Sequence, residues 1–158
     1  MKLVDLTDRI WAGATAPTVH DDVLGELTHR PHGWCGRIDA GERTLEIVLG
    51  ERSVELSNDM LAAARHILGR LDQFEAEARR FVAQKALRTN LPQPFVLCGF
   101  GALDVHPDWR NMRTRNPGLA AQLMNTQTLG RLQFTIAEER DVLEVYFDGN
   151  LPIDIDYH

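Results

Sequence analysis

The chain has 158 residues, of which 44% are hydrophobic and 25% are charged, and its formal net charge at pH 7 is -6. This length and composition predict a single soluble globular domain, residues 1–158, that buries its core without disulfide support. The acidic balance argues against a general nucleic-acid-binding protein and against attraction to an anionic membrane. It permits basic protein partners.

The cellular compartment is predicted from the cysteines and the N-terminus. Two cysteines, Cys35 and Cys98, are too few for a disulfide framework and favour a reducing cytoplasm. The N-terminal stretch MKLVDLTDRIW carries Asp5 and Asp8 where a signal peptide requires an uninterrupted apolar run. Since no apolar stretch approaches the roughly 18 residues of a membrane span, we expect a cytoplasmic protein.

The first third of the chain carries mostly strand signals. Residues 1–11 alternate in part and predict a short strand, whereas the small, Pro-containing segment 12–22 predicts a loop. Alternation then predicts strands at 23–29, 34–39 and 43–49, separated by RPHG and by a turn near Ala40 and Gly41.

The register between the strands at 34–39 and 43–49 is also predicted. A tight turn places Trp34 opposite Ile47, and it places Cys35 and Arg37 on the same face as Glu46. One face is then apolar and the other charged, as in a half-exposed antiparallel sheet.

Residues 57–87 predict one long amphipathic helix. Ser57 is a suitable N-cap, and Asp59 lies in the first turn. The apolar stripe consists of Met60, Ala64, Ile67, Leu71, Phe74, Ala78 and Phe81, and Gly69 can bend or divide the helix. The stripe is long enough for a short dimer seam, but packing against the apolar face of the sheet is the favoured interpretation.

The C-terminal part returns to strands after a long irregular region. Strands are predicted at 95–100, 129–137, 142–147 and 153–157, with a loop at 101–118 and a helical turn or two at 119–125. The expected fold class is therefore α+β: an antiparallel sheet of about five or six strands with one long helix packed on one face.

The stretch HRPHGWCGR places His29, His32 and Cys35 at even spacing, as a metal or nucleophile site would. However, strand geometry puts His29 on the core side with Trp34 and Cys35 on the opposite side, leaving His32 at the turn. Zinc needs about four converging ligands. We therefore predict no metal site here and no cofactor.

Cys98 and His106 are a second candidate pair, as a thiol and an imidazole. Cys98 lies in an apolar run, where cysteine behaves as a small hydrophobe. No catalytic residue is predicted from it.

Segment 104–115, DVHPDWRNMRTR, concentrates unusual residues. Its arginines could hold a phosphate or carboxylate, or the segment could bind a protein with Trp109 as anchor. An exposed basic loop that pairs with the acidic surface explains the same residues. Near the C-terminus, Asp148, Asp154 and Asp156 suggest a hard cation, but an acidic outward face of an edge strand is the favoured interpretation.

Two segments together resemble a known group of proteins. The order DDVLGELTHRPHGWCGRIDAGERTLEIVLG followed by LSNDMLAAARHILGRLDQFEAEARRFVAQKAL resembles bacterial domains of unknown function. These share a strand with LG, a strand with an aromatic residue and a glycine (here Trp34 and Gly36), and a strand followed by a long helix. The resemblance covers 21–88 and extends more weakly to 129–158, which includes LEVYFDGN. Related domains occur among immunity proteins of polymorphic toxin systems, which bind and block a cognate toxin.

The resemblance implies a non-enzymatic binding protein, an immunity protein whose acidic charge steers it to a basic, nuclease-like toxin. The expected partner-binding residues come from the RPHG turn, segment 104–115 and the acidic C-terminal strand, and they are His32, Asp104, His106, Asp108, Trp109, Arg110, Arg113, Arg115, Asp154 and Asp156. The alternatives are a small enzyme or anionic-ligand-binding domain that uses 104–115, and an oligomeric accessory protein that uses the helix stripe as a seam. We expect a monomer or a homodimer.

Overall fold

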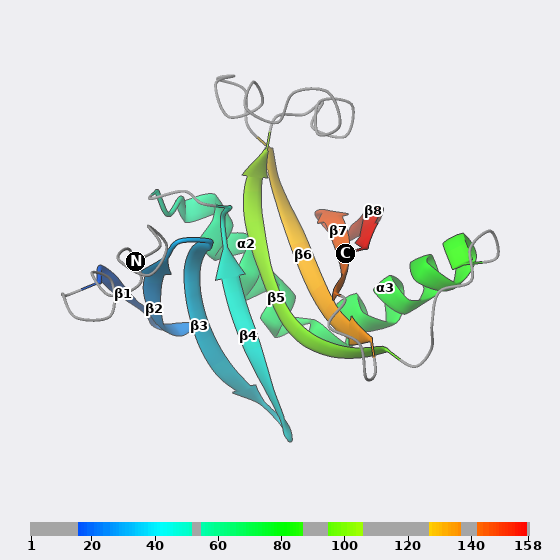
Figure 1. Ribbon diagram of the computed structural model, residues 1–158, viewed down its shortest axis with the longest axis horizontal. Helices are drawn as coiled ribbons and strands as arrows, with labels where there is room; N and C mark the ends of the chain where they lie inside the picture. The colour runs from blue at the N-terminus through cyan, green and yellow to red at the C-terminus, as the bar shows by residue number, and fades with distance from the viewer. Residues whose placement is uncertain (1–15, 52–54, 87–94, 106–126, 137–141, 158) are drawn as a thin grey trace, which may run out of the picture.

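The computed structural model describes residues 16–51, 55–86, 95–105, 127–136 and 142–157. The strand predicted at 1–11, the helical turn at 119–125 and the predicted loop from 106 onward lie outside these residues. The elements in chain order are β1 (Thr18–Asp21), β2 (Gly25–Arg30), β3 (Gly33–Ala40), β4 (Arg43–Leu49), α2 (Asn58–Gly69), α3 (Leu71–Ala86), β5 (Phe95–Val105), β6 (Gln127–Ile136), β7 (Val142–Asp148) and β8 (Leu151–Tyr157) (Figure 1).

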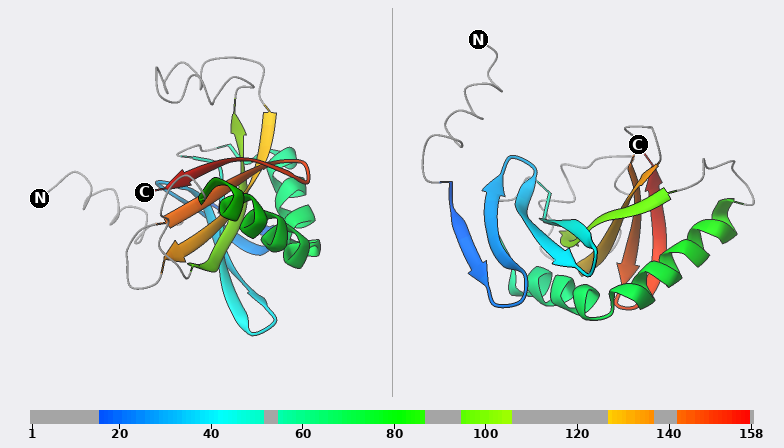
Figure 2. Two further views of the ribbon diagram at one scale, coloured as in Figure 1. Left: turned by 90° about the vertical axis from the view of Figure 1, so that its right-hand side faces the viewer. Right: turned by 90° about the horizontal axis from the view of Figure 1, so that it is seen from below.

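The strands form one eight-stranded sheet in which each strand lies beside its neighbours in the sequence. All adjacent pairs are antiparallel except β4 and β5, which are parallel. The helices connect this pair, and a crossover through helices is what allows consecutive strands to run in the same direction. Both helices lie on one side of the sheet (Figure 2).

The predicted helix 57–87 divides into two. Helix α2 begins after Ser57, whose Oγ accepts the N–H of Met60 at 3.1 Å, as predicted. It ends at Gly69, where the N–H of Arg70 turns back to the carbonyl of Ile67 at 3.1 Å. Helix α3 then starts in a new direction (Figure 2). In the part of the chain that the structure describes, no helix is long and apolar enough to cross a membrane.

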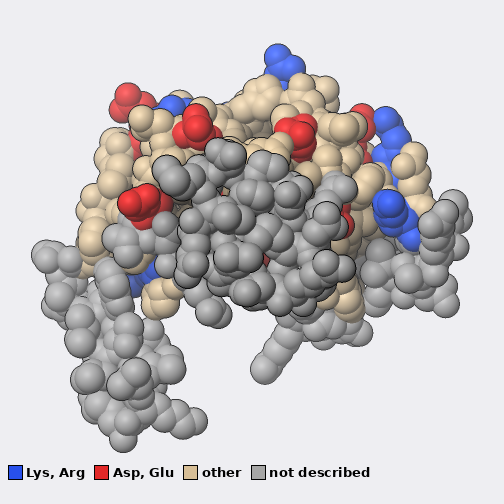
Figure 3. All heavy atoms as spheres, turned by 90° about the horizontal axis from the view of Figure 1, so that it is seen from above, with Lys and Arg blue, Asp and Glu red and all other residues tan. Residues whose placement is uncertain are grey.

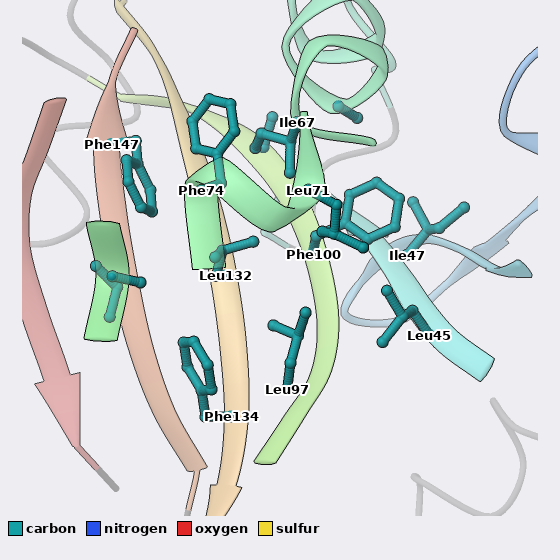
Figure 4. Close-up of a cluster of buried hydrophobic side chains, with 14 of the residues drawn as sticks. Leu45, Ile47, Ile67, Leu71, Phe74, Leu97, Phe100, Leu132, Phe134 and Phe147 are labelled. Carbon is teal, nitrogen blue, oxygen red and sulfur yellow. The ribbon is translucent and has the colours of Figure 1, made fainter. Parts of the chain in front are cut away.

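The predicted apolar stripe packs on the sheet (Figure 4). Ile67 and Phe74 are 1% and 3% exposed, and the Phe74 ring meets Phe147 of β7 edge-on with centroids 5.0 Å apart. Burial of each such side chain contributes about 1.5–3 kcal/mol. The further buried members of this core include Leu45, Ile47, Leu71, Leu97, Phe100, Leu132 and Phe134. The stripe is thus occupied by the sheet.

An ion pair between the buried Asp21 and the exposed Arg65 attaches the β1–β2 turn to α2. One carboxylate oxygen of Asp21 accepts the N–H groups of Val23 and Leu24 at 3.0 and 2.8 Å, and Arg65 donates to the other from Nε at 3.0 Å. The hydrogen bond from Arg65 lowers the pKa of Asp21 to about 2, against the opposing effect of burial, and the two backbone N–H groups lower it further.

The predicted fold class is wrong. The structure is mostly sheet, with eight strands, one parallel pair and two helices, rather than five or six antiparallel strands under one helix. Strand β1 falls in the predicted loop 12–22, and β5 continues to Val105 within the predicted loop 101–118. Both errors have the same cause. The sequences of β1 and of the end of β5 lack strand alternation, and pairing with β2 and with β6 makes these segments strands.

The predicted register of β3 and β4 is displaced by two residues. Trp34 lies opposite Leu49, and Ala40 pairs with Arg43 around a two-residue turn in which Gly41 has a φ of +67°. A two-residue displacement keeps every side chain on its face. The predicted faces, and the predicted pairing of His29 with Trp34, are therefore confirmed.

Candidate functional site

The sheet face opposite the helices, here called the open face, carries two rows of polar and small residues. The first row crosses β3 to β8 through Cys35, Val48, Gly101, Arg131, Tyr146 and Asp154. The second crosses the same strands through Arg37, Glu46, Gly99, Gln133, Glu144 and Asp156. Strand alternation puts these side chains opposite the apolar core.

A hollow of about 1270 Å³, here called the central hollow, opens on this face. It is lined by His32, Arg37, Thr44, Glu46, Val48, Gly50, Glu51, Cys98, Arg131, Gln133, Thr135, Val142 and Glu144. A smaller hollow of about 410 Å³ adjoins it over β2 to β4 and shares His32, Arg37, Glu46 and Val48 with it. The open face is therefore a continuous depression across most of the sheet.

Two glycines of β5, Gly99 and Gly101, form the floor of the open face beneath the side chains of Gln133 and Arg131. A Cβ on Gly101 would lie 1.7 Å from the carbonyl oxygen of Val48, and a Cβ on Gly99 would lie 2.9 Å from that of Glu46. The close approach of β4 to β5 therefore requires glycine at both positions.

The side chain of Arg131 on β6 extends over Gly101, its paired residue on β5, toward β4. Its side chain is 4% exposed, its Nη2 donates to the carbonyl of Val48 at 3.3 Å, and its Nη1 lies 3.5 Å from Glu144 Oε2 and 3.8 Å from Glu51 Oε1. Its Nε has no hydrogen-bond partner among the described residues. A buried guanidinium needs such a counter-charge, so Arg131 and Glu144 depend on each other.

Tyr146 completes this buried cluster. Its hydroxyl donates to Glu144 Oε2 at 2.7 Å. Burial raises the pKa of Tyr146 well above its usual range, and the neighbouring Glu144 carboxylate raises it further. Tyr146 therefore stays a neutral hydrogen-bond donor at physiological pH and does not act as a base.

The carboxylates at the rim are held more loosely. Glu46 Oε1 lies 3.6 Å from Arg37 Nη2, and the Glu46 and Glu51 side chains are 62% and 64% exposed. The two rows and Glu51 together contain the carboxylates of Glu46, Glu51, Glu144, Asp154 and Asp156, against the guanidiniums of Arg37 and Arg131. The open face around the hollow is therefore acidic.

The two thiols on this face are not activated. Cys35 Sγ lies 3.2 Å from His32 Nε2, but burial and the charge of Glu46 raise the pKa of Cys35. Cys98 donates to the carbonyl of Gln133 at 3.3 Å, and burial and Glu46 likewise raise the pKa of Cys98. Since a thiolate is the nucleophile, neither cysteine is prepared for covalent chemistry.

The evenly spaced triplet is split by the sheet, as predicted. His29 is 5% exposed on the helix side, with its ring centroid 5.2 Å from that of Trp34. Cys35 lies on the open face, opposite Val48. His29 and Cys35 therefore cannot bind one metal ion together.

Four predicted partner-binding residues fall in the described part of the chain. His32 lines the central hollow, and Asp154 and Asp156 are half-buried at the β8 ends of the two rows. Asp104 is exposed near the end of β5 and accepts a hydrogen bond from Thr128 Oγ1. His106, Asp108, Trp109, Arg110, Arg113 and Arg115 lie outside the described residues.

The central residues of the site were missed from the sequence. Alternation in the strand predicted at 129–137 places Arg131 and Gln133 on the polar face, but it does not indicate that Arg131 is buried. The available signal was a charged residue at a same-face position in each of two consecutive strands, Arg131 and Glu144. Gly99 and Gly101 gave no signal, because their role depends on β4.

Comparison with known proteins adds no relative: no family model, no curated protein and no solved structure matches the chain.

Proposed function

We propose that this protein is a non-enzymatic binding protein whose open face receives a basic protein partner, as an immunity protein receives the toxin that it blocks. The observation that carries the proposal is the surplus of carboxylates on the open face, where the two rows and Glu51 hold five carboxylates against two guanidiniums. The formal net charge of -6 acts in the same direction over a longer range. Acidic charge of this kind accelerates and orients encounter with a basic surface.

The size of the hollow supports a protein partner over a small molecule. Pockets for small ligands have volumes of about 300–1,000 Å³ and enclose most of the ligand. The central hollow measures about 1270 Å³ and extends from Arg37 on β3 to Glu144 on β7. A surface of this breadth suits a protruding segment of another protein.

The distribution of charge supports the open face as the contact surface. On the side of the molecule seen from above, single acidic and basic groups are interspersed among neutral atoms where described residues are visible (Figure 3). The open face instead gathers five carboxylates along two rows and at Glu51.

The alternative of a small enzyme or an anionic-ligand-binding domain depends on segment 104–115, which lies outside the described residues beyond Val105. The raised pKa values of Cys35 and Cys98 do not support a thiol enzyme. We therefore retain the binding proposal alone.

The test is binding to the product of the adjacent gene, measured by calorimetry with the purified chain. We expect tight binding that weakens by about tenfold or more when Glu46 and Glu51 are both changed to lysine. The variant Asp72→Lys with Glu77→Lys is the matched control, because it makes the same change of charge on α3 in the helix layer. Absence of binding, or an equal loss with this control, would overturn the proposal.

A further inference from the structure

We infer that the central hollow receives a lysine or arginine side chain of an extended basic segment, with Glu46 and Glu51 as its carboxylate partners. The inference rests on the proposed function and names the chemistry of the partner at that same site.

The carboxylates around the hollow differ in how fully they are engaged. Glu144 is 7% exposed and accepts a 2.7 Å hydrogen bond from Tyr146. The ion-pair distances of Glu46 and Glu51 are 3.6 and 3.8 Å, beyond the usual range of about 2.7–3.2 Å for a hydrogen bond. The exposed pair of Arg37 and Glu46 contributes little, so Glu46 can turn to a new cation at low cost. The Glu51 side chain is 64% exposed, so its carboxylate can meet a new cation while it stays near the buried Arg131.

Room for a long side chain depends on Gln133, which lies between Gly99 and Glu144 in its row. Its Oε1 lies 2.9 Å from where a Cβ on Gly99 would stand, and this half-buried, flexible side chain can turn aside. A lysine or arginine can then place its aliphatic stem over Gly99 while its charged head reaches Glu46 at the rim.

Arg131 supplies a second, independent indication of an incoming chain. It lines the hollow, its side chain is 4% exposed, and its Nε–H lacks an acceptor among the described residues. Its two Nη groups hold the contacts with Val48, Glu144 and Glu51, so an acceptor at Nε would add a hydrogen bond without breaking any of them. A main-chain carbonyl is an acceptor of the required kind, and every extended peptide carries one beside each side chain.

The same surroundings disfavour an anionic ligand. Glu51 and Glu144 lie beside the guanidinium of Arg131 and Glu46 lines the same hollow, so a phosphate or carboxylate would meet like charges. A polyamine would satisfy the carboxylates but would offer no carbonyl to Arg131. The chemistry therefore favours a basic peptide segment.

The experiment uses a fluorescein-labelled octapeptide of alternating lysine and glycine, titrated with the full chain and followed by anisotropy at low salt. We expect saturable binding, weakened by about tenfold or more in the variant Glu46→Gln with Glu51→Gln. Asp72→Asn with Glu77→Gln on α3 removes the same two charges and should stay within about twofold of wild type. Spermidine should compete poorly, and equal competition by spermidine would refute the role of the carbonyl.

A variant that adds bulk without changing the charge distinguishes binding in the hollow from attraction by surface charge. Gln133→Trp fills the floor beside Gly99 without changing the charge, and Gln73→Trp adds the same bulk at an exposed position on α3. We expect Gln133→Trp to weaken peptide binding by about fivefold or more and Gln73→Trp to leave it unchanged. Circular dichroism verifies that each variant is folded.

The outcomes distinguish this inference from the proposed function. If the adjacent-gene product binds but the peptide does not, the basic-side-chain site is wrong and the binding function stands. If the peptide binds only through charge, so that Gln133→Trp has no effect, the hollow is not the receptor. If the peptide binds and the adjacent-gene product does not, the inferred site stands and the proposed function fails.

Discussion

Along each strand, side chains point alternately to the helix-covered face and to the open face. Strand β7 allows the two faces to be compared directly. Leu143, Val145 and Phe147 point to the helices and are at most 1% exposed, while Glu144 and Tyr146 point the other way and are 7% and 2% exposed. Both faces are thus buried at β7. The helix side is held by apolar packing. The other side combines a small apolar cluster of Leu103, Leu129 and Tyr146 with paired polar groups, and such pairs fail when one partner is removed.

The largest effect should come from the floor of the open face. In Gly101→Ala the new Cβ would lie 1.7 Å from a backbone oxygen of the paired strand, so β4 and β5 would have to separate. We expect the free energy of unfolding to fall by about 4 kcal/mol or more. On the helix side, Gly130→Ala places its Cβ 2.8 Å from the flexible end of Ile67, which can move, at a cost of about 1 kcal/mol. Urea unfolding measures both, and equal losses would contradict the contrast.

The second effect concerns the buried charge pair. Arg131→Met leaves Glu144 buried without its guanidinium, and we expect a loss of about 3 kcal/mol. Adding Glu144→Leu should restore part of that stability, because no uncompensated charge then remains. A double variant less stable than Arg131→Met alone would show that the pair is not coupled in this way.

A smaller effect is expected from acid at the ion pair on the helix side. The pKa of Asp21 is lowered to about 2 in the folded chain, so its stabilisation is complete above the unfolded pKa of about 4 and is lost as the pH falls from about 4 to 2. The loss should amount to about 2 kcal/mol. Thermal unfolding of wild type and Asp21→Asn across this range measures it. The variant should lack this part of the pH dependence, and parallel curves would refute the assignment.

The smallest effect tests the hydroxyl of the buried cluster. Tyr146→Phe removes the 2.7 Å hydrogen bond to Glu144 and keeps the ring, so we expect a loss of about 1 kcal/mol. Chemical denaturation detects such a change. No loss would mean that Glu144 is satisfied without Tyr146.

Local pattern was sufficient wherever an element carries its own period. The strand predicted at 43–49 coincides with β4, the N-cap Ser57 and the buried stripe of the helices were found, and the faces of Cys35 and Arg37 were assigned correctly. The sequence pattern did not predict β1 or the end of β5, because these segments are strands only through their pairing with neighbouring strands. The candidate site was found only at its margins, at His32, Asp154 and Asp156.

The sequence by itself determined which residues alternate, where α2 begins and which faces are apolar, because propensity and period act over a few neighbouring residues. Only the tertiary structure decided that β4 and β5 run parallel and so close together that Gly99 and Gly101 are required. It also decided that Arg131 and Glu144 share one buried cluster beneath the hollow. Those properties arise from contacts between distant segments, and no local pattern encodes them.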